Sequence, residues 1–165
     1  MTSPVAGEPV DPTFLAGMEN DVTDLQADAV RMGCTLRRAA AQTLPDATNT
    51  TVSWDTEDVD TDSMWAVGTP TVITIPEDGV WAISATTDGS ANTTGRGYLE
   101  INITSTGPIT NVVAQGGIPV GSDRGASTWT GPLVAGDTFI VVLFMDMAGA
   151  ANIAGANLTC YRVAA

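Results

Sequence analysis

A run of acidic residues in the first half of the chain is the sequence feature that most resembles a ligand site. It consists of Asp55, Glu57, Asp58, Asp60 and Asp62. The spacing of Asp58, Asp60 and Asp62 matches the opening of an EF-hand calcium loop. Ser63 and Thr69, however, stand where that loop requires glycine and a bidentate glutamate. Two interpretations stay open: a different kind of calcium site on these three aspartates, and a solvated acidic loop.

The composition argues against most enzyme chemistry. The 165 residues include 19 acidic residues and six arginines, with no lysine and no histidine, so the formal net charge is −13. Without histidine there is no Ser-His or Cys-His pair, and without lysine there is no Schiff base or P-loop. We therefore predict that the chain is not an enzyme and needs no cofactor.

The same composition limits the partners. Nucleic acid and anionic membrane surfaces both attract basic proteins, so a net charge of −13 disfavours them. The longest apolar run covers residues 139–145 and is far shorter than the roughly 20 residues of a membrane span. We expect neither nucleic acid binding nor membrane insertion.

Cysteine, tryptophan and paired arginine residues each allow more than one role. Cys34 and Cys160 lack the spacing of a metal or redox motif, which favours two small buried hydrophobic residues. Arg37 and Arg38 could pair with acids of a neighbouring subunit or lie on an exposed strand edge. Four tryptophans could form a carbohydrate-stacking platform, but core or interface anchors are favoured. They are Trp54, Trp65, Trp81 and Trp129.

The spacing of apolar residues predicts two segments before the main domain. Residues 1–11 are rich in proline and polar residues and should form an extended arm. Residues 12–33 carry apolar residues at alternating spacings of three and four, which predicts one amphipathic helix that could form a trimeric coiled coil. The predicted anchor residues on this helix are Leu15, Met18, Val22, Leu25 and Met32. The same spacing continues to Leu36, and Gly33 should end the helix.

Residues 34–165 have the pattern of an all-β domain. Runs rich in threonine, valine and isoleucine are separated by glycine and proline, which predicts short antiparallel strands. The expected strands are 35–43, 50–54, 71–75, 80–87, 98–105, 109–115, 127–133, 137–145 and 156–164. About nine to ten strands of this kind predict a jelly-roll sandwich.

The predicted strand 137–145 is apolar on both faces. Because such a strand is covered on both faces, its second apolar face is predicted to contact another subunit, another protein or the helix. The alternative is an ordinary central strand with one partly exposed face. The candidate interface residues are Ile140, Val142 and Phe144, together with Tyr161 of the last strand.

Several short motifs carry a family resemblance. A strand ends at Pro76, Gly79 precedes Trp81 by two residues, and a Gly-Asp turn at 136–137 comes before a late strand. In this order the motifs resemble the jelly roll shared by complement globular heads and tumour necrosis factor, especially the versions found in bacteriophage virion proteins. The chain departs from the family by inserting Val80 between the glycine and the aromatic residue.

The resemblance implies both an assembly and a function. It implies a homotrimer with the threefold interface on the sheet that carries the last strand, and with strand 137–145 in the opposite sheet. It also implies a structural virion protein assembled in the host cytoplasm: a head decoration, fibre or minor tail protein attached to other capsid or tail proteins through its arm and helix. The alternative is a receptor-binding knob that recognises host-surface carbohydrate or protein.

Overall fold

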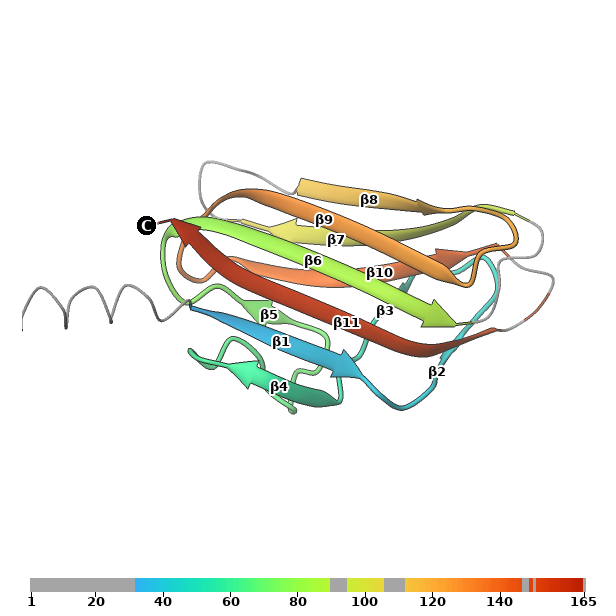
Figure 1. Cartoon of the computed structure of the whole chain (residues 1–165), viewed down its shortest axis with the longest axis horizontal. Coiled ribbons are helices and arrows are strands. Elements are labelled where there is room, and N and C mark those ends of the chain that lie inside the picture. Colours follow the sequence, from blue (N-terminus) through green and yellow to red (C-terminus); the bar gives the residue numbers. More distant parts are fainter. Residues whose placement is uncertain (1–31, 90–94, 106–111, 147–148, 150, 165) are drawn as a thin grey trace, which may run out of the picture. The chain divides into compact units, whose positions relative to one another are not determined.

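The structure is a computed structural model that describes residues 32–89, 95–105, 112–146, 149 and 151–164. The regular structure of these residues consists of strands (Figure 1). The strands are β1 Gly33–Arg38, β2 Gln42–Leu44, β3 Thr50–Thr51, β4 Thr56–Asp60, β5 Ile73–Thr74, β6 Gly79–Gly89, β7 Gly97–Thr104, β8 Val112–Ile118, β9 Arg124–Leu133, β10 Thr138–Met145 and β11 Ala151–Ala164. No helix long and apolar enough to span a membrane occurs in this part of the chain.

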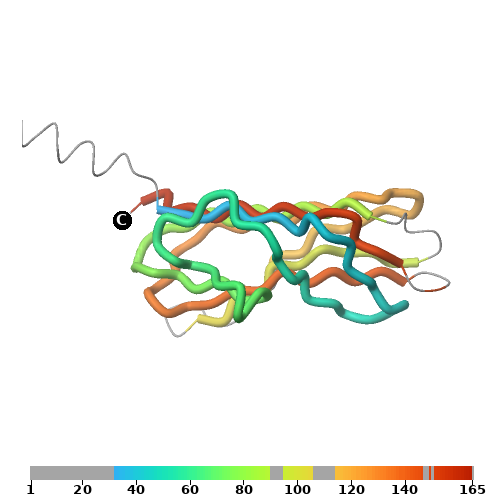
Figure 2. The backbone as a smooth tube through the Cα atoms, turned by 90° about the horizontal axis from the view of Figure 1, so that it is seen from below, coloured from blue at the N-terminus to red at the C-terminus, as the bar shows by residue number. Residues whose placement is uncertain are grey.

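The strands form two antiparallel sheets packed face to face. The first, called the β11 sheet, has the order β4-β1-β11-β6-β9, with β2 also paired to β11. The second, called the β10 sheet, has the order β3-β10-β7-β8, with β5 also paired to β10. Figure 2 shows β1 in blue running beside β11 in red. The resemblance placed the strand at 137–145 and the last strand in opposite sheets, and the topology confirms this.

Alternation along the central strands directs one set of side chains into the core. In β6, Trp81, Ile83 and Ala85 are buried, and the residues between them are partly exposed. The register aligns Ala85 with Leu158 and Ile83 with Cys160 of β11, and both partners are also buried. Side chains that are in register and on one face of a sheet pack against each other as well as against the opposite sheet.

Large side chains from both sheets and from the loops between strands fill the core. The largest fully buried ones are Trp54, Trp81, Phe139, Leu36, Met64, Ile73, Ile75, Ile83, Leu99, Ile101, Leu133 and Ile153. Trp65 and Trp129 pack against this core from partly buried positions. The tryptophans therefore serve as packing residues, as favoured from the sequence, and they do not gather into a platform.

The Gly-Asp turn before β10 is built around a buried carboxylate. Gly136 has a φ of 88°, a left-handed conformation that glycine adopts without strain. Asp137 is fully buried. Its Oδ2 accepts hydrogen bonds from Ser105 Oγ at 2.6 Å and from Val134 N at 3.0 Å. These bonds tie the end of β7 to the turn between β9 and β10.

The predicted combination of a jelly roll with an amphipathic helix requires correction. All regular structure in the described residues is β-sheet, and Gly33 begins β1 where a helix end was predicted. The backbone oxygen of Met32 accepts a hydrogen bond from Arg162 N, which continues the pairing with β11. The four-residue step from Met32 to Leu36 fits a strand equally well, because four is an even number and strands have a period of two. The other predicted anchor residues, Leu15, Met18, Val22 and Leu25, lie outside the described residues.

Part of the acidic run forms a strand where a loop was one of the expectations. Residues 56–60 form the edge strand β4, which pairs with β1 through a bulge between Thr35 and Leu36. Glu57, Asp58 and Val59 are all exposed. A short, charged edge strand of this kind discourages pairing with other chains, so the acidic composition suits the end of a sheet.

The buried core predicts how much the truncation of a single side chain lowers the free energy of unfolding. Leu36 of β1 has no exposed surface, so Leu36→Ala should lower the free energy of unfolding by about 2–5 kcal/mol. Val67 is 81% exposed, and Val67→Ala should change it by no more than about 0.5 kcal/mol. Urea unfolding of the two variants measures the difference, and equal effects would contradict this core.

Candidate functional site

The aspartates proposed as calcium ligands are engaged by groups of the same chain. Asp58 accepts two hydrogen bonds from Arg37, from Nε at 2.5 Å and Nη2 at 2.6 Å. Asp60 accepts hydrogen bonds from the backbone nitrogens of Met64 and Trp65 at 2.9 and 3.0 Å. Asp62 accepts one from the neighbouring threonine hydroxyl. Across the described ranges, no group of three or more acidic or cysteine residues is placed to hold a metal ion.

The bidentate contact between Arg37 and Asp58 joins β1 to β4. The Arg37 hydrogen bonds lower the pKa of Asp58, and the same hydrogen bonds raise the pKa of Arg37. Both side chains are largely solvated, so the pair fixes the position of β4 more than it adds stability. Arg37 thus pairs within its own chain, whereas an acid of a neighbouring subunit had been one expectation.

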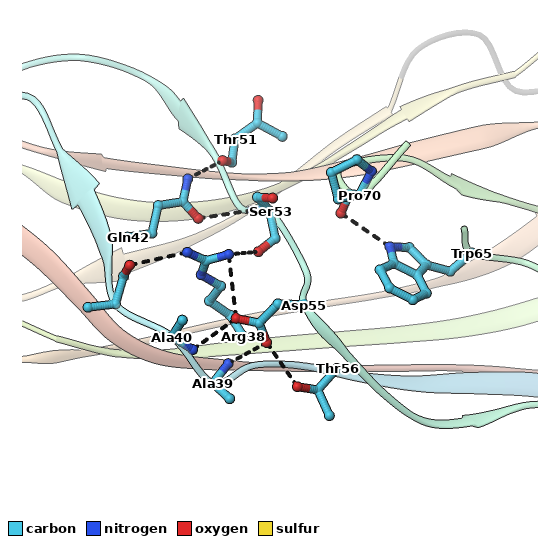
Figure 3. Close-up of polar contacts among 11 residues, drawn as sticks. Arg38, Ala39, Ala40, Gln42, Thr51, Ser53, Asp55, Thr56, Trp65 and Pro70 are labelled. Atoms are coloured by element: carbon cyan, nitrogen blue, oxygen red, sulfur yellow. Dashed lines mark hydrogen bonds and ion pairs between the residues drawn. The ribbon is translucent and has the colours of Figure 1, made fainter. Parts of the chain in front are cut away.

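The Arg38 side chain joins the connection between β1 and β2 to the loop that contains Ser53 (Figure 3). Its Nη1 donates to Ser53 O at 3.0 Å and its Nη2 donates to Ala41 O at 3.1 Å. Nη1 also lies 3.5 Å from Asp55 Oδ2. Gln42 reinforces the connection, because its Nε2 donates to Thr51 O and its Oε1 accepts from Ser53 N.

Asp55 completes this polar cluster from the other side (Figure 3). Its two carboxylate oxygens accept hydrogen bonds from the backbone nitrogens of Ala39 and Ala40, each at 2.8 Å. Desolvation raises the pKa of Asp55, but these two bonds, one from Thr56 Oγ1 and the charge of Arg38 together outweigh it, so the net shift is downward. The cluster is therefore a structural clasp between loops, and it presents no reactive group.

The two cysteines face each other across neighbouring strands. The register of β1 and β11 aligns Cys34 with Cys160, and both are buried free thiols. Burial raises the pKa of Cys34 to about 12, helped by the charges of Asp60 and Glu57. Burial also raises the pKa of Cys160, with Cys34 adding to the shift. Since thiolates are the reactive form of cysteine, both residues behave as the small buried hydrophobic residues predicted.

Side chains from the same sheet cover part of the outward apolar face of β10. Val142 is only 5% exposed, while Ile140 and Phe144 are half-buried. The ring of Tyr98 stacks on Phe144 with 4.8 Å between centroids and 9° between planes. Tyr98 Oη donates to Asn49 Oδ1 at 2.9 Å. An intrachain aromatic pair thus supplies part of the cover that the sequence predicted from a partner.

The outer face of the β11 sheet has a different chemistry. Thr35, Thr159, Ser84 and Thr128 are in register across β1, β11, β6 and β9. We call them the hydroxyl row. Tyr161, the remaining predicted interface residue, lies in the next row and is 36% exposed. Individual motifs in the sequence do not reveal this row, because it depends on the pairing register of four strands.

Comparisons with known proteins identify the fold. No protein-family model matches the chain, and no curated protein matches its sequence. The globular domain of zebrafish complement 1qA superposes with a TM-score of 0.56 at 14% identity, covering 80% of this chain and 97% of that domain. Murine APRIL at pH 5.0 gives a TM-score of 0.54 at 13% identity, covering 79% of this chain and 99% of that one. The chain has the jelly-roll fold of the complement and tumour necrosis factor group.

Asp55 predicts a measurable dependence of stability on pH. Because its folded pKa lies below the ordinary value of 3.8, the ionised carboxylate stabilises the fold above that pH and ceases to do so as the pH falls through the lowered pKa. Asp55→Asn should therefore be less stable than wild type at pH 7, and the gap should shrink in acid. Urea unfolding at neutral and strongly acidic pH measures it. Glu57→Gln, an equal charge change at an exposed position, should show no such convergence, and a constant gap for Asp55→Asn would contradict the clasp.

The burial of the two cysteines predicts how they react with thiol reagents. Both thiols should fail to react with a thiol reagent in the folded protein at pH 8 and should react fully in urea, because burial disfavours the thiolate. Cys34→Ala and Cys160→Ala should each lower the free energy of unfolding by about 1–2 kcal/mol. Reductant should leave wild-type stability unchanged, and loss of the fold in reductant would show that a disulfide is required.

Proposed function

We propose that this chain is a non-enzymatic structural module that forms a homotrimer through the outer face of its β11 sheet. The observation that carries the proposal is the lack of charge at the centre of this face. The hydroxyl row and the rows on either side of it hold twelve positions across β1, β11, β6 and β9, with Arg37 as the one charged residue, and Arg37 is paired with Asp58. In a chain of net charge −13, such a face suits contact with another copy, since like charges would otherwise repel.

Exposed apolar side chains on β4 and β11 support the same face. Val59 is 52% exposed, Tyr161 36% and Val163 55%. Tyr161 is in register with Gly33 and Ala82, so its ring is bordered by small residues and can insert between subunits. Aromatic residues surrounded by small neighbours are typical anchors of protein interfaces.

The family resemblance supports a trimer on independent grounds. It implies a threefold interface on the sheet that carries the last strand, and here that strand is β11. Ile140, Val142 and Phe144 lie in the opposite sheet, where Val142 is buried and Phe144 is stacked on Tyr98. The trimer proposed here therefore uses Tyr161 and leaves those three residues outside the main contact.

We further propose that the trimer is a structural protein of a virion, as the resemblance to bacteriophage jelly rolls implies. The core residues in the described part of the chain span residues 34–160, and we assign attachment to capsid or tail proteins to residues 1–31. Assembly in the host cytoplasm agrees with two reduced cysteines. The order of the family motifs and the division of the chain into residues 1–31 and the jelly-roll domain support the virion proposal.

A charge inserted in the hydroxyl row tests the trimer. Light scattering of the full chain at micromolar concentration should give three times 16.9 kDa. Thr159→Arg should give a folded monomer, because a trimer would bring three unpaired charges into its interface. Thr104→Arg, an exposed threonine on β7 of the other sheet, is the matched control and should remain trimeric. A wild-type monomer, or a Thr159→Arg trimer, would contradict this interface.

Truncation tests the attachment proposal separately. Removing residues 1–31 should leave a folded trimer with unchanged urea stability that no longer joins virus particles. Co-sedimentation with particles measures the loss. Normal incorporation of the truncated chain would mean that the jelly roll itself carries the attachment surface. Absence of the full-length chain from purified particles would contradict the virion proposal and leave the trimer test unaffected.

A further inference from the structure

A pocket of about 470 Å³ opens where β7 and β8 meet the loop that follows β8. Its lining includes Arg96, Tyr98, Gln115, Gly117 and Pro119. The pocket is formed by β7 and β8 of the β10 sheet and by the loop after β8, so it takes no part in the trimer face proposed above. It therefore raises a question of its own, namely which ligand these side chains would accept.

One wall of the pocket is a fixed aromatic ring. Phe144 covers one face of Tyr98 through the stacking contact, and the hydrogen bond to Asn49 holds its hydroxyl. On the other side, the residue in register with Tyr98 on β8 is Gly117. A Cβ at Gly117 would meet no atom within 4 Å. The glycine thus leaves space beside the second face of Tyr98, where a ring of similar size can stack.

The polar groups around this space include Arg96, whose side chain pairs with no described residue. Four described arginines form ion pairs: Arg37 with Asp58, Arg38 with Asp55, Arg124 with Asp88 and Arg162 with Glu77. Arg96 is exposed, and its guanidinium makes no ion pair or hydrogen bond within the part of the chain that the structure describes. In a chain of net charge −13, a guanidinium beside a pocket that pairs with no described residue is a natural partner for a carboxylate on a ligand.

The remaining rim offers both donors and acceptors. Gln115 Nε2 donates to Glu100 Oε1 at 2.6 Å, which orients the amide and leaves its oxygen available. Val120 is 63% exposed and adds an apolar lip. A ligand with one apolar face, hydroxyl edges and a single negative charge satisfies all of these groups. A polyanion would be repelled by the net charge of the protein and by Glu100.

We propose that this pocket binds one pyranose residue that carries a carboxylate, as hexuronic acids do. The apolar face of the sugar stacks on Tyr98 above Gly117, the carboxylate pairs with Arg96, and a hydroxyl donates to Gln115 Oε1. The site needs no residue of a second subunit, so the proposal stands apart from the trimer.

Binding of methyl glucuronide and methyl galacturonide to the full chain, followed by titration calorimetry or ligand-observed NMR, tests the site. At least one uronide should bind with a Kd of about 1 mM, as expected for a ligand of this size. The matching neutral glycosides should bind about tenfold more weakly, because they lack the charged hydrogen bond to Arg96. No binding of either uronide, or equal binding of charged and neutral sugars, would overturn the proposal.

Two variants place the ligand in this pocket. Arg96→Gln should weaken uronide binding about tenfold and leave the neutral glycosides unchanged, while Arg124→Gln should change neither, because Arg124 is already paired with Asp88. Gly117→Val should abolish both kinds of binding, since its side chain occupies the space beside Tyr98 and valine suits a strand. Unfolding in urea checks that each variant is folded. Uronide binding that survives Gly117→Val would overturn the assignment.

Oligomeric state, measured on the same samples, separates this test from that of the trimer. The trimer-breaking variant Thr159→Arg should bind the uronide with wild-type affinity, because the pocket lies within one subunit. Loss of uronide binding in a folded Thr159→Arg protein would contradict a single-subunit site. A wild-type monomer that binds the uronide would sustain the pocket and overturn only the trimer.

Discussion

The burial of one face of each sheet against the other is the interaction on which the remaining structure depends. Side chains alternate along a strand, so each inward residue determines what its neighbours present to solvent. Leu158 points into the core, and Thr159 is therefore exposed in the hydroxyl row. Leu99 is buried in the same way, which leaves Tyr98 to stack on Phe144 and border the pocket. The two outer surfaces discussed above are consequences of how the core is packed.

Charge then distinguishes the two outer surfaces. The few cations of this acidic chain are used mainly within it: Arg37 holds the edge strand β4, and Arg38 holds the loops around Asp55. The acidic run is thereby confined to one edge of the β11 sheet, and the hydroxyl row and its two neighbouring rows stay uncharged across β11, β6 and β9. Arg96 differs because its guanidinium pairs with no described residue, and it lies beside the aromatic face of Tyr98 that Gly117 leaves open.

Period-two alternation identified most strands from the sequence, and their antiparallel arrangement followed from the short connections. The polar strand β4 was missed because neither of its faces is apolar, and the helix pattern extended into β1 because Met32 and Leu36 fit both periods. The site was less predictable. Pairing between strands distant in sequence decides that Asp58 meets Arg37. The same kind of pairing places Tyr98 beside a glycine and not beside a large residue. A single sequence does not encode that register in any local motif.

Sedimentation of the full chain at low and high salt tests the central claim, that an uncharged sheet face joins three copies. Each subunit carries a net charge of −13, so screening by salt should reduce repulsion between subunits while an uncharged interface loses no attraction. The account predicts a trimer whose dissociation constant falls as sodium chloride rises from about 0.05 M to about 1 M, over which the Debye length shrinks severalfold. A monomer at both concentrations, or a trimer that dissociates as salt is added, would contradict it.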